Sequence, residues 1–524
     1  MLTQRISLTF FLSALLLTAN FGSSEDMPRP LPEGYQATDP DKAISVSELC
    51  EATAATGLFT GAILVADEGK VIYEKAFGLA NREWNIPNTT DTRFRLASVS
   101  KQFCTMLVMQ LIQEGELTLE DTISDHLLYY RKDNGERITI HHLMAHQSGI
   151  PDFTANYDYR RSISKISYEP DEFIRKFCSG DLQHEPGTIY SYCNAGYIIL
   201  GRIIEKVTRL TFEQNLEERI FTPLGMTKSG YDRNDTILEK RASGYTRGPF
   251  GDTNADFVEM GTAPGAAGAL FSTVDDMFLW DRALYTDQLL KKEYRELLFT
   301  PNRDVPEVKA AGGRKQSRYG YGWNIDNRVH PVTEHKTKVV SHGGAINGFR
   351  AMVYRLVDDD SFIIILCNQG DQPGGNAICN SILGLGRELT HILTEQPFRM
   401  PPPPRLSQEQ RLFRLLEEEG IEAAIDWFLE KGKKAPWGGT TVSLADHLVE
   451  LGRAEEGLRF LEMEIELTPE KVWLIRKAAE TCLNSGAPGR AIALADQGLA
   501  LKSDDERLRE LKAEAEKARE RSED

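Results

Sequence analysis

Four consecutive prolines at positions 401–404 divide the 524-residue sequence into two parts with different patterns. Proline has a fixed φ and lacks a backbone N–H, so a run of four cannot lie inside a helix or a central strand. Such a run forms a stiff, extended spacer. A chain of this length is also too long for a single hydrophobic core. We therefore expect at least two separately folded regions, joined at this spacer.

The part before the prolines combines strand-like and helix-like segments. Near its beginning, residues 61–66 and 71–77 are rich in β-branched and aromatic side chains and flank a short turn with Gly69, which predicts a hairpin. Further strands are expected over 319–323, 338–341, 350–356 and 361–366, followed by a helix over 376–391. Strands at both ends with helices between them predict an α+β fold. In this fold an antiparallel sheet is flanked by helices and carries an inserted helical region.

The part after the prolines lacks strand patterns and contains a repeat. Leu451-Gly452 and Ser485-Gly486 lie 34 residues apart, and small residues recur at the same spacing around them. A 34-residue period of paired helices resembles tetratricopeptide repeats. The large aromatic positions of that repeat are poorly kept, so a generic bundle of helical hairpins stays open. In both cases we expect an all-α helical-repeat domain with a surface for a protein partner.

The N-terminal residues predict export. Arg5 precedes an apolar run over 6–19, and the small residues Gly22 and Ser24 follow it. This order is typical of a cleaved secretory signal. The run is shorter than the roughly 20 residues that span a bilayer, and a buried N-terminal helix is the alternative. We expect an exported protein, periplasmic or extracellular, without stable membrane insertion after the signal is removed.

These features divide the chain into five expected segments. They are a signal peptide over 1–24, a linker over 25–45, an α+β domain over 46–396, a proline-rich linker over 397–405 and a helical-repeat domain over 406–524. The net charge of −17 repels phosphate backbones, so no nucleic acid partner is expected. The seven cysteines are spread too thinly for a disulfide framework.

A serine and a lysine at the start of a predicted helix are the first candidates for chemistry. Ser98 and Lys101 are three residues apart, which places both side chains on one face of a helix. A serine hydroxyl is a poor nucleophile at neutral pH and needs a base within hydrogen-bond reach. Lysine serves as that base where burial lowers its pKa, and residues 98–114 are apolar around most of the helix, as in a buried one. Ser100 points about 100° away, so it is the weaker candidate.

Two further motifs strengthen this pair. Tyr192-Cys-Asn194 and His342-Gly343-Gly344 follow Ser98-Val-Ser-Lys101, and the last motif ends a predicted strand. Their order and separations resemble the class C β-lactamase and penicillin-binding-protein family of serine hydrolases. The resemblance covers about residues 45–395. Flanking matches are His146-Gln-Ser-Gly-Ile-Pro-Asp152 and Gly268-Ala-Leu-Phe-Ser-Thr-Val-Asp-Asp276.

The resemblance implies catalytic roles for the matched positions. Ser98 would attack a carbonyl carbon and become acylated, and Lys101 would take or share the hydroxyl proton. Tyr192 would pass a proton to the leaving group. The backbone N–H groups of Ser98 and Ala345 would form the oxyanion hole, which stabilises the charge that develops in the transition state. No metal or other cofactor is expected for this chemistry.

The resemblance also implies substrate-binding positions, namely Asn194, His342, Gly343 and Gly344. Here the sequence departs from the better-known β-lactamase pattern, because His342-Gly-Gly344 replaces Lys-Thr-Gly and removes a fixed positive charge and a hydroxyl. Family members with histidine in this motif include esterases and D-amino-acid peptidases. We therefore expect a D-Ala-type carboxypeptidase, another peptidase or an esterase that acts on a small acyl substrate (peptide, amide or ester). Two interpretations of Arg350 stay open: it is a partner for a substrate carboxylate, or it is an exposed strand arginine.

Other classes of function have weaker support. An α/β-hydrolase would carry GxSxG, and no serine has glycine at both −2 and +2. His142 and His146 have the i, i+4 spacing of zinc ligands, but no glutamate follows His142 and no third ligand is evident. The main alternative is a non-catalytic, penicillin-binding-like sensor or scaffold that acts through its helical repeats. Because the chain keeps Ser98, Lys101 and Tyr192, we favour the enzyme.

Overall fold

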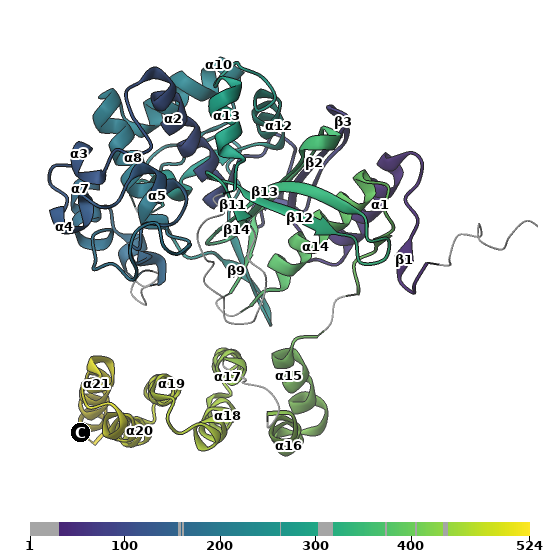
Figure 1. Cartoon of the computed structure of the whole chain (residues 1–524). Helices are drawn as coiled ribbons and strands as arrows, with labels where there is room; N and C mark the ends of the chain where they lie inside the picture. The colour runs from purple at the N-terminus through teal and green to yellow at the C-terminus, as the bar shows by residue number, and fades with distance from the viewer. Residues whose placement is uncertain are drawn as a thin grey trace, which may run out of the picture.

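The structure is a computed structural model that describes residues 31–155, 159, 162–262, 264–301, 318–372, 375–403, 406–432 and 439–523. The expected signal peptide over 1–24 lies outside the described residues, as does Pro404. Figure 1 shows an α/β domain and, apart from it, a row of helices that begins with α15. Within the described ranges, no helix is long and apolar enough to cross a membrane.

A seven-stranded antiparallel sheet forms the centre of the α/β domain. Its spatial order is β11 (Arg318–Tyr319), β12 (Asn324–Val329), β13 (Lys336–Ile346), β14 (Phe349–Leu356), β15 (Ser361–Cys367), β2 (Gly61–Asp67) and β3 (Lys70–Phe77). The predicted antiparallel sheet, with strands from both ends of the domain, is confirmed. The sequence pattern missed β12, which is largely polar, and placed a strand over 319–323 where β11 has only two residues.

Both faces of this sheet are buried, because successive strand residues point into two different hydrophobic cores. In β2, Ala62 and Leu64 face the core that includes α2 (Lys101–Glu114) and α12 (Val274–Ala283). Ile63 and Val65 face the core with α1 (Lys42–Ala55) and α14 (Ala377–Leu393). Burial on both faces explains why the central strands are continuous apolar runs.

Helix α2 is the centre of the helices that lie beside the sheet. Its residues from Lys101 to Leu111 are all buried, and Gly115 ends it in the left-handed region, with φ +79°. The predicted buried helix is present, but the α-helix begins only at Lys101, since Ala97–Ser100 form a 3-10 turn, η1. The other helices of the α/β domain are α3 (Ile123–His126), α4 (Lys132–Gly135), α5 (Ile140–Met144), α7 (Pro170–Phe177), α8 (Asn194–Thr208), α9 (Phe212–Leu216), α10 (Thr222–Leu224), α11 (Gly265–Gly268) and α13 (Lys292–Leu298).

Short strands complete the α/β domain. They are β4 (Leu79–Asn81), β5 (Ile86–Pro87), β6 (Phe94–Arg95), β7 (Gly230–Tyr231), β8 (Tyr245–Gly248), β9 (Gly251–Asn254), β10 (Leu270–Ser272) and β16 (Gln369–Asp371). At the ends of the domain, β1 (Tyr35–Gln36) pairs antiparallel with β17 (Phe398–Arg399). Helix α1 then starts at Lys42, where the Asp41 side chain caps its first turn. The folded domain thus begins inside the segment 25–45 that was expected to be a linker.

The C-terminal region consists of helical pairs in its described part. The pairs are α15 (Gln408–Glu419) with α16 (Ile421–Gly432), α17 (Thr440–Glu450) with α18 (Ala454–Leu467), and α19 (Val472–Asn484) with α20 (Pro488–Leu501), before α21 (Glu506–Glu523). Leu451-Gly452 and Ser485-Gly486 occupy the turns of the second and third pairs. A Cβ at Gly457 would come within 3.1 Å of Ala445 Cα, so a small residue permits close packing of α18 on α17. The likeness to tetratricopeptide repeats stays a prediction.

Candidate active site

The turn η1 presents Ser98 while it buries Lys101. Ser98 lies within this 3-10 turn, and Lys101 is the first residue of α2. A spacing of three residues matches one 3-10 turn, so both side chains lie on the same side. Ser98 is partly exposed and Lys101 is fully buried. Ser100 is also buried, and its hydroxyl accepts a hydrogen bond from the Leu270 N–H at 3.1 Å.

The amino group of Lys101 contacts three oxygen atoms. Its Nζ lies 3.1 Å from Ser98 Oγ, 2.8 Å from Asn194 Oδ1 and 2.9 Å from the carbonyl oxygen of Ala267. Burial lowers the pKa of Lys101 to about 7, because the charged form loses its hydration; the negative charge of Asp152 opposes this shift. At neutral pH a large fraction of Lys101 is therefore unprotonated and able to accept a proton.

Asn194 connects Lys101 to an acidic residue. It begins α8, and its Nδ2 donates to Asp152 Oδ2 at 3.1 Å, while its backbone N–H donates to Asp152 Oδ1 at 3.3 Å. These bonds orient the amide so that its oxygen faces Lys101. From the sequence, Asp152 was recognised only as the end of a flanking motif, without a role, and Ala267 carried no signal.

Tyr192 contacts Ser98 from the loop before α8. Its hydroxyl shares a hydrogen bond with Ser98, and Lys101 Nζ lies 4.9 Å from the centre of its ring. Burial raises the pKa of Tyr192 above its usual value, so the hydroxyl stays protonated at neutral pH. A neutral hydroxyl bonded to Ser98, which Lys101 Nζ also contacts, is placed to pass a proton through that serine.

A buried histidine supports the loop that carries Tyr192. His146 Nδ1 accepts a hydrogen bond from the Cys193 N–H at 3.1 Å, and its ring centroid lies 4.2 Å from that of Tyr192. Burial lowers the pKa of His146 well below its usual value, so the ring is neutral. His142, its expected i, i+4 partner, instead accepts a hydrogen bond from the Thr139 N–H at 3.2 Å. Within the described residues, no three His, Cys, Asp or Glu side chains lie together as metal ligands would.

His342 lies on β13 as a neutral, buried imidazole. Its Nδ1 lies 2.7 Å from the Gly343 carbonyl oxygen and its Nε2 lies 3.0 Å from the Tyr319 hydroxyl. The carbonyl requires a donor, so the proton sits on Nδ1 and Nε2 accepts from Tyr319. Burial, with a smaller effect from the Lys101 charge, lowers the pKa of His342 to about 3. The ring centroids of His342 and Tyr192 are 6.3 Å apart, so His342 is near Tyr192 but is held by other partners.

Strand β13 approaches η1 most closely at Gly344. A Cβ at this position would lie 2.1 Å from the Leu96 carbonyl oxygen, and one at Gly343 would lie 2.7 Å from Met352 Sδ. Gly344 therefore has no room for a side chain, because backbone blocks it, whereas at Gly343 the flexible Met352 side chain would have to move. The next residue, Ala345, lines the same cleft as Ser98. The absent side chain at Gly344 thus allows the two backbone segments to border one cleft.

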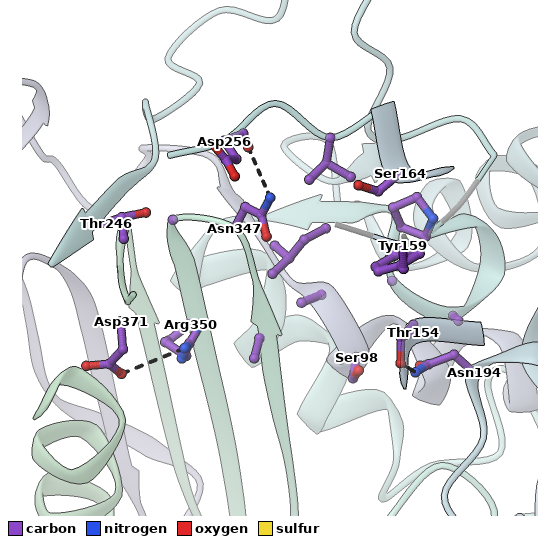
Figure 2. Close-up of a pocket in the computed structure, with 18 of the residues that line it drawn as sticks. Ser98, Thr154, Tyr159, Ser164, Asn194, Thr246, Asp256, Asn347, Arg350 and Asp371 are labelled. Carbon is purple, nitrogen blue, oxygen red and sulfur yellow. Dashed lines mark hydrogen bonds and ion pairs between the residues drawn. The ribbon is translucent and has the colours of Figure 1, made fainter. Parts of the chain in front are cut away.

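The cleft beside Ser98 has a volume of about 460 Å³. Figure 2 shows Ser98 between Asn194 on one side and Arg350 with Asp371 on the other. The lining of the cleft is largely polar, with contributions from the loop at Thr154, from β13 and β14, and from the strands β8 and β9. The lining residues beyond those already named include Thr246, Thr253, Asn254, Asp256 and Asn347.

Arg350 lines this cleft but carries its own counter-charge. Its guanidinium lies 3.7 Å from the carboxylate of Asp371, which also accepts hydrogen bonds from the N–H groups of Ile378 and Cys379 at the start of α14. The Arg350 side chain is only 19% exposed. It is therefore neither an exposed strand arginine nor a free cation for a substrate carboxylate.

Comparison with known proteins agrees with this fold. Residues 46–382 match the family model described as Beta-lactamase, which is more than half of the chain. The chain therefore belongs to the beta-lactamase family. Penicillin-binding protein 4* of Bacillus subtilis (strain 168) is 29% identical over 362 residues, covering 66% of this chain and 75% of that protein. Protein flp of Staphylococcus aureus (strain MRSA252) is 25% identical over 333 residues, and the chain spans 63% of its length.

Solved structures show the same fold. The penicillin binding protein from Bacillus halodurans superposes with a TM-score of 0.55 and 26% identity, over 64% of this chain and 98% of that chain. D-amino acid amidase from Ochrobactrum anthropi SV3 superposes with a TM-score of 0.58 and 22% identity, over 68% of this chain and 98% of that chain. The membership in the serine β-lactamase and penicillin-binding-protein superfamily that the three motifs predicted is confirmed.

Proposed function

We propose that the chain is a serine hydrolase that forms an acyl-enzyme on Ser98. The observation that carries this proposal is the position of Lys101, a fully buried lysine with a pKa of about 7 whose Nζ lies 3.1 Å from Ser98 Oγ. A serine needs such a base to become nucleophilic at neutral pH. Membership in a superfamily of serine hydrolases supports the same chemistry.

In the acylation step, Ser98 Oγ attacks the carbonyl carbon of the substrate and neutral Lys101 takes its proton. The N–H groups of Ser98 and Ala345 stabilise the resulting oxyanion, and one such donor contributes about 3 kcal/mol. Tyr192 then donates a proton to the departing amine or alcohol and regains one from Lys101. The bond to the leaving group breaks, and Ser98 remains as an ester.

Deacylation reverses these proton transfers with water as the nucleophile. Lys101 and Tyr192 together accept a proton from the attacking water, and Oγ of Ser98 regains a proton as it leaves. The products are a carboxylic acid and the free enzyme. No step requires a metal or a redox group, because each proton passes between groups that this chain supplies.

For the substrate we propose an amide or an ester without a carboxylate beside the scissile bond, ahead of a peptide with a D-Ala-type terminus and of a β-lactam, both of which carry that carboxylate. His342 is neutral near pH 7, since its pKa is about 3, and the Arg350 charge is paired with Asp371. The cleft therefore has little free positive charge with which to hold a substrate carboxylate. The name of one relative states that it binds penicillin. Such binding is consistent with acylation of the nucleophilic serine by a β-lactam.

The decisive experiment replaces Ser98 with alanine. We expect Ser98→Ala to abolish turnover of p-nitrophenyl acetate. Mass spectrometry should locate an acetyl adduct on Ser98 of the wild type and find none in the variant. Ser100→Ala is the matched control, because Ser100 is buried and bonds to the backbone of Leu270; it should keep its turnover. Unchanged turnover in a folded Ser98→Ala protein would leave the sensor or scaffold role as the better explanation.

We further propose that the protein is exported. The support is the charged start, the apolar run and the small residues within 1–24. Fractionation of cells that express the full chain should place the mature protein outside the cytoplasm, with its N-terminus shortened. A chain that lacks residues 2–24 should stay in the cytoplasm.

A further inference from the structure

A second hairpin, formed by β8 and β9, borders the cleft opposite η1. Thr246 of β8 and Thr253 and Asn254 of β9 line the same cleft as Ser98. Strand β8 pairs with β16, whereas β9 pairs only with β8 among the described strands. The hydroxyl and amide groups of these residues suit the polar backbone of a peptide-like substrate. The sequence did not predict this hairpin.

The tip of this hairpin contacts the C-terminal helices. Phe250, in the turn between β8 and β9, stacks on His447 of α17, with ring centroids 4.0 Å apart and an interplanar angle of 6°. Phe413 of α15 lies edge-on to the Phe250 ring, with the two ring centroids 5.5 Å apart. The carbonyl oxygen of Pro249 accepts a hydrogen bond from Gln410 Nε2 at 2.5 Å. In Figure 1, β9 extends from the α/β domain toward α17.

The contact with Gln410 links the hairpin to the start of the helical region. The Oε1 of Gln410 accepts a hydrogen bond from the Ser407 N–H at 2.8 Å, which completes the capping box of α15. One amide therefore fixes both the first turn of α15 and the hairpin tip. The first helix after the proline-rich linker, α15, thus sets the orientation of the helical region relative to the cleft.

The hairpin has further anchors in the α/β domain, at Asp252 near its tip and at Tyr245 at its base. Asp252 forms an ion pair with Arg82, and the Tyr245 hydroxyl accepts a hydrogen bond from the Arg82 N–H at 2.7 Å. Most residues of β9 are nevertheless exposed. Strand β9 is the edge of the small sheet β16-β8-β9, and a small sheet is marginally stable without packing on one face. Besides the ion pair of Asp252 with Arg82, the tip is held by its contacts with α15 and α17.

We propose that the C-terminal helices hold the β8–β9 hairpin in place and so determine how the cleft binds the distal part of an extended acyl donor. Phe250 is the positioning residue, and Thr246, Thr253 and Asn254 determine specificity. This inference rests on the proposed acyl-enzyme at Ser98. A small acyl group such as acetyl stays near Ser98, so its reaction does not depend on the hairpin.

The test compares Phe250→Ala, His447→Ala and the double variant, all in the full chain. The substrates are p-nitrophenyl acetate and the p-nitrophenyl ester of an N-acetylated tripeptide, and hydrogen exchange of residues 245–254 is the readout that needs no activity. Each single variant should raise KM for the longer ester by about three- to tenfold, the effect of one lost aromatic pair, with unchanged kcat/KM for the acetate. Hydrogen exchange of the hairpin should become faster.

Conservative variants separate stacking from general damage. Phe250→Tyr and His447→Phe keep a ring at the contact and should restore wild-type KM and exchange. The double alanine variant should be no worse than Phe250→Ala, because Phe250→Ala already removes the contacts of this ring with both His447 and Phe413. Unchanged exchange and unchanged KM in Phe250→Ala and His447→Ala would mean that the Arg82 anchors suffice, which overturns the proposal. If the wild type cleaves neither ester, the function at Ser98 is wrong, while hydrogen exchange still reports on the hairpin.

Discussion

Lys101 Nζ lies 3.1 Å from Ser98 Oγ, and its other two oxygen neighbours, on Asn194 and Ala267, can only accept hydrogen bonds. A neutral amino group has two N–H donors and one lone pair. When Asn194 and Ala267 take the two donors, the lone pair faces the Ser98 hydroxyl. Protonation adds a third donor toward the same hydroxyl. Both protonation states thus fit one arrangement of side chains, and the proton transfer needs no movement of the lysine.

The activity should depend on pH through Lys101. Its pKa is lowered to about 7, so the neutral form that accepts the proton dominates above this value and is lost below it. We predict that kcat/KM for p-nitrophenyl acetate rises with pH to a plateau, with a midpoint near 7. His342, with a pKa of about 3, should not add a second step near neutrality. A rate that stays constant between about pH 5 and 9 would exclude Lys101 as the base.

Replacement of Lys101 should lower the activity and remove one source of pH dependence from the stability. Lys101→Arg and Lys101→Met should lower kcat/KM by about 10²- to 10⁴-fold, since neither side chain can accept the proton. The folded chain releases this proton near pH 7 and the unfolded chain near pH 10.5. The contribution of Lys101 to the free energy of unfolding should therefore increase with pH across this interval, while the buried cysteines, whose thiol pKa is raised from 9.0, give the opposite slope above that pH.

Urea unfolding at several pH values measures this difference. The free energy of unfolding of the wild type minus that of Lys101→Met should increase between pH 7 and 10.5. The same difference for Lys292→Met, at an exposed lysine of α13, is the control and should not change with pH. Parallel pH dependence in Lys101→Met and the wild type would contradict a lowered pKa of Lys101.

Removal of the Asp152 charge should shift the pH profile. Asp152 raises the pKa of Lys101 against the larger effect of burial. We therefore expect Asp152→Asn to lower that pKa further and to move the midpoint of the activity profile to a pH below that of the wild type. Asp181→Asn, at an exposed side chain, should leave the midpoint unchanged. A midpoint that moves upward in Asp152→Asn would contradict the charge effect.

A methyl group at Gly344 should separate β13 from η1. The added Cβ would lie 2.1 Å from the Leu96 carbonyl oxygen, so one of the two segments must move. Because a displacement of about 1 Å costs about 10²-fold in rate, Gly344→Ala should lower kcat/KM by at least that factor. Gly384→Ala on α14 is the matched control, since its Cβ meets no atom within 4 Å. Equal rates for the two variants would refute the close approach.

A buried ion pair should hold α12 against the sheet. Arg355 of β14 and Asp281 of α12 are both almost fully buried and bonded to each other. Asp281 also pairs with Arg282, whereas among the described residues Arg355 pairs only with Asp281, so it is Asp281→Asn that leaves a buried charge uncompensated and should lower the free energy of unfolding by about 3–5 kcal/mol. Chemical denaturation with circular dichroism gives this value. A loss below about 1 kcal/mol, typical of surface pairs, would show that the pair is not needed.

The parts of the structure that local sequence pattern controls were predicted well. The hairpin over 61–77, the strands β14 and β15 and the helix α14 follow from apolar runs and the turns between them. The largely polar strand β12 gave no such signal, because its pairing with β13 is set by the rest of the sheet. The same holds for the β8–β9 hairpin, whose strand residues are mostly polar.

The site divides in a similar way. Ser98, Lys101, Tyr192, Asn194 and His342 lie in recognisable motifs, and the structure brings these five residues together. Their supporting residues were not predicted: the Ala267 carbonyl oxygen contacts Lys101 through the backbone, so its residue type carries no information. The neutral state of His342 also depends on burial, which only the folded chain reveals.

The pairing of β1 with β17 makes residues 35 and 399 neighbours, although the whole α/β domain lies between them. A short peptide can therefore join these two ends without stretching. Circular permutation of this domain, with new ends at the turn over 358–360, is then compatible with the sheet. The same adjacency allows the domain to be inserted into a surface loop of another protein, with both connections at one corner.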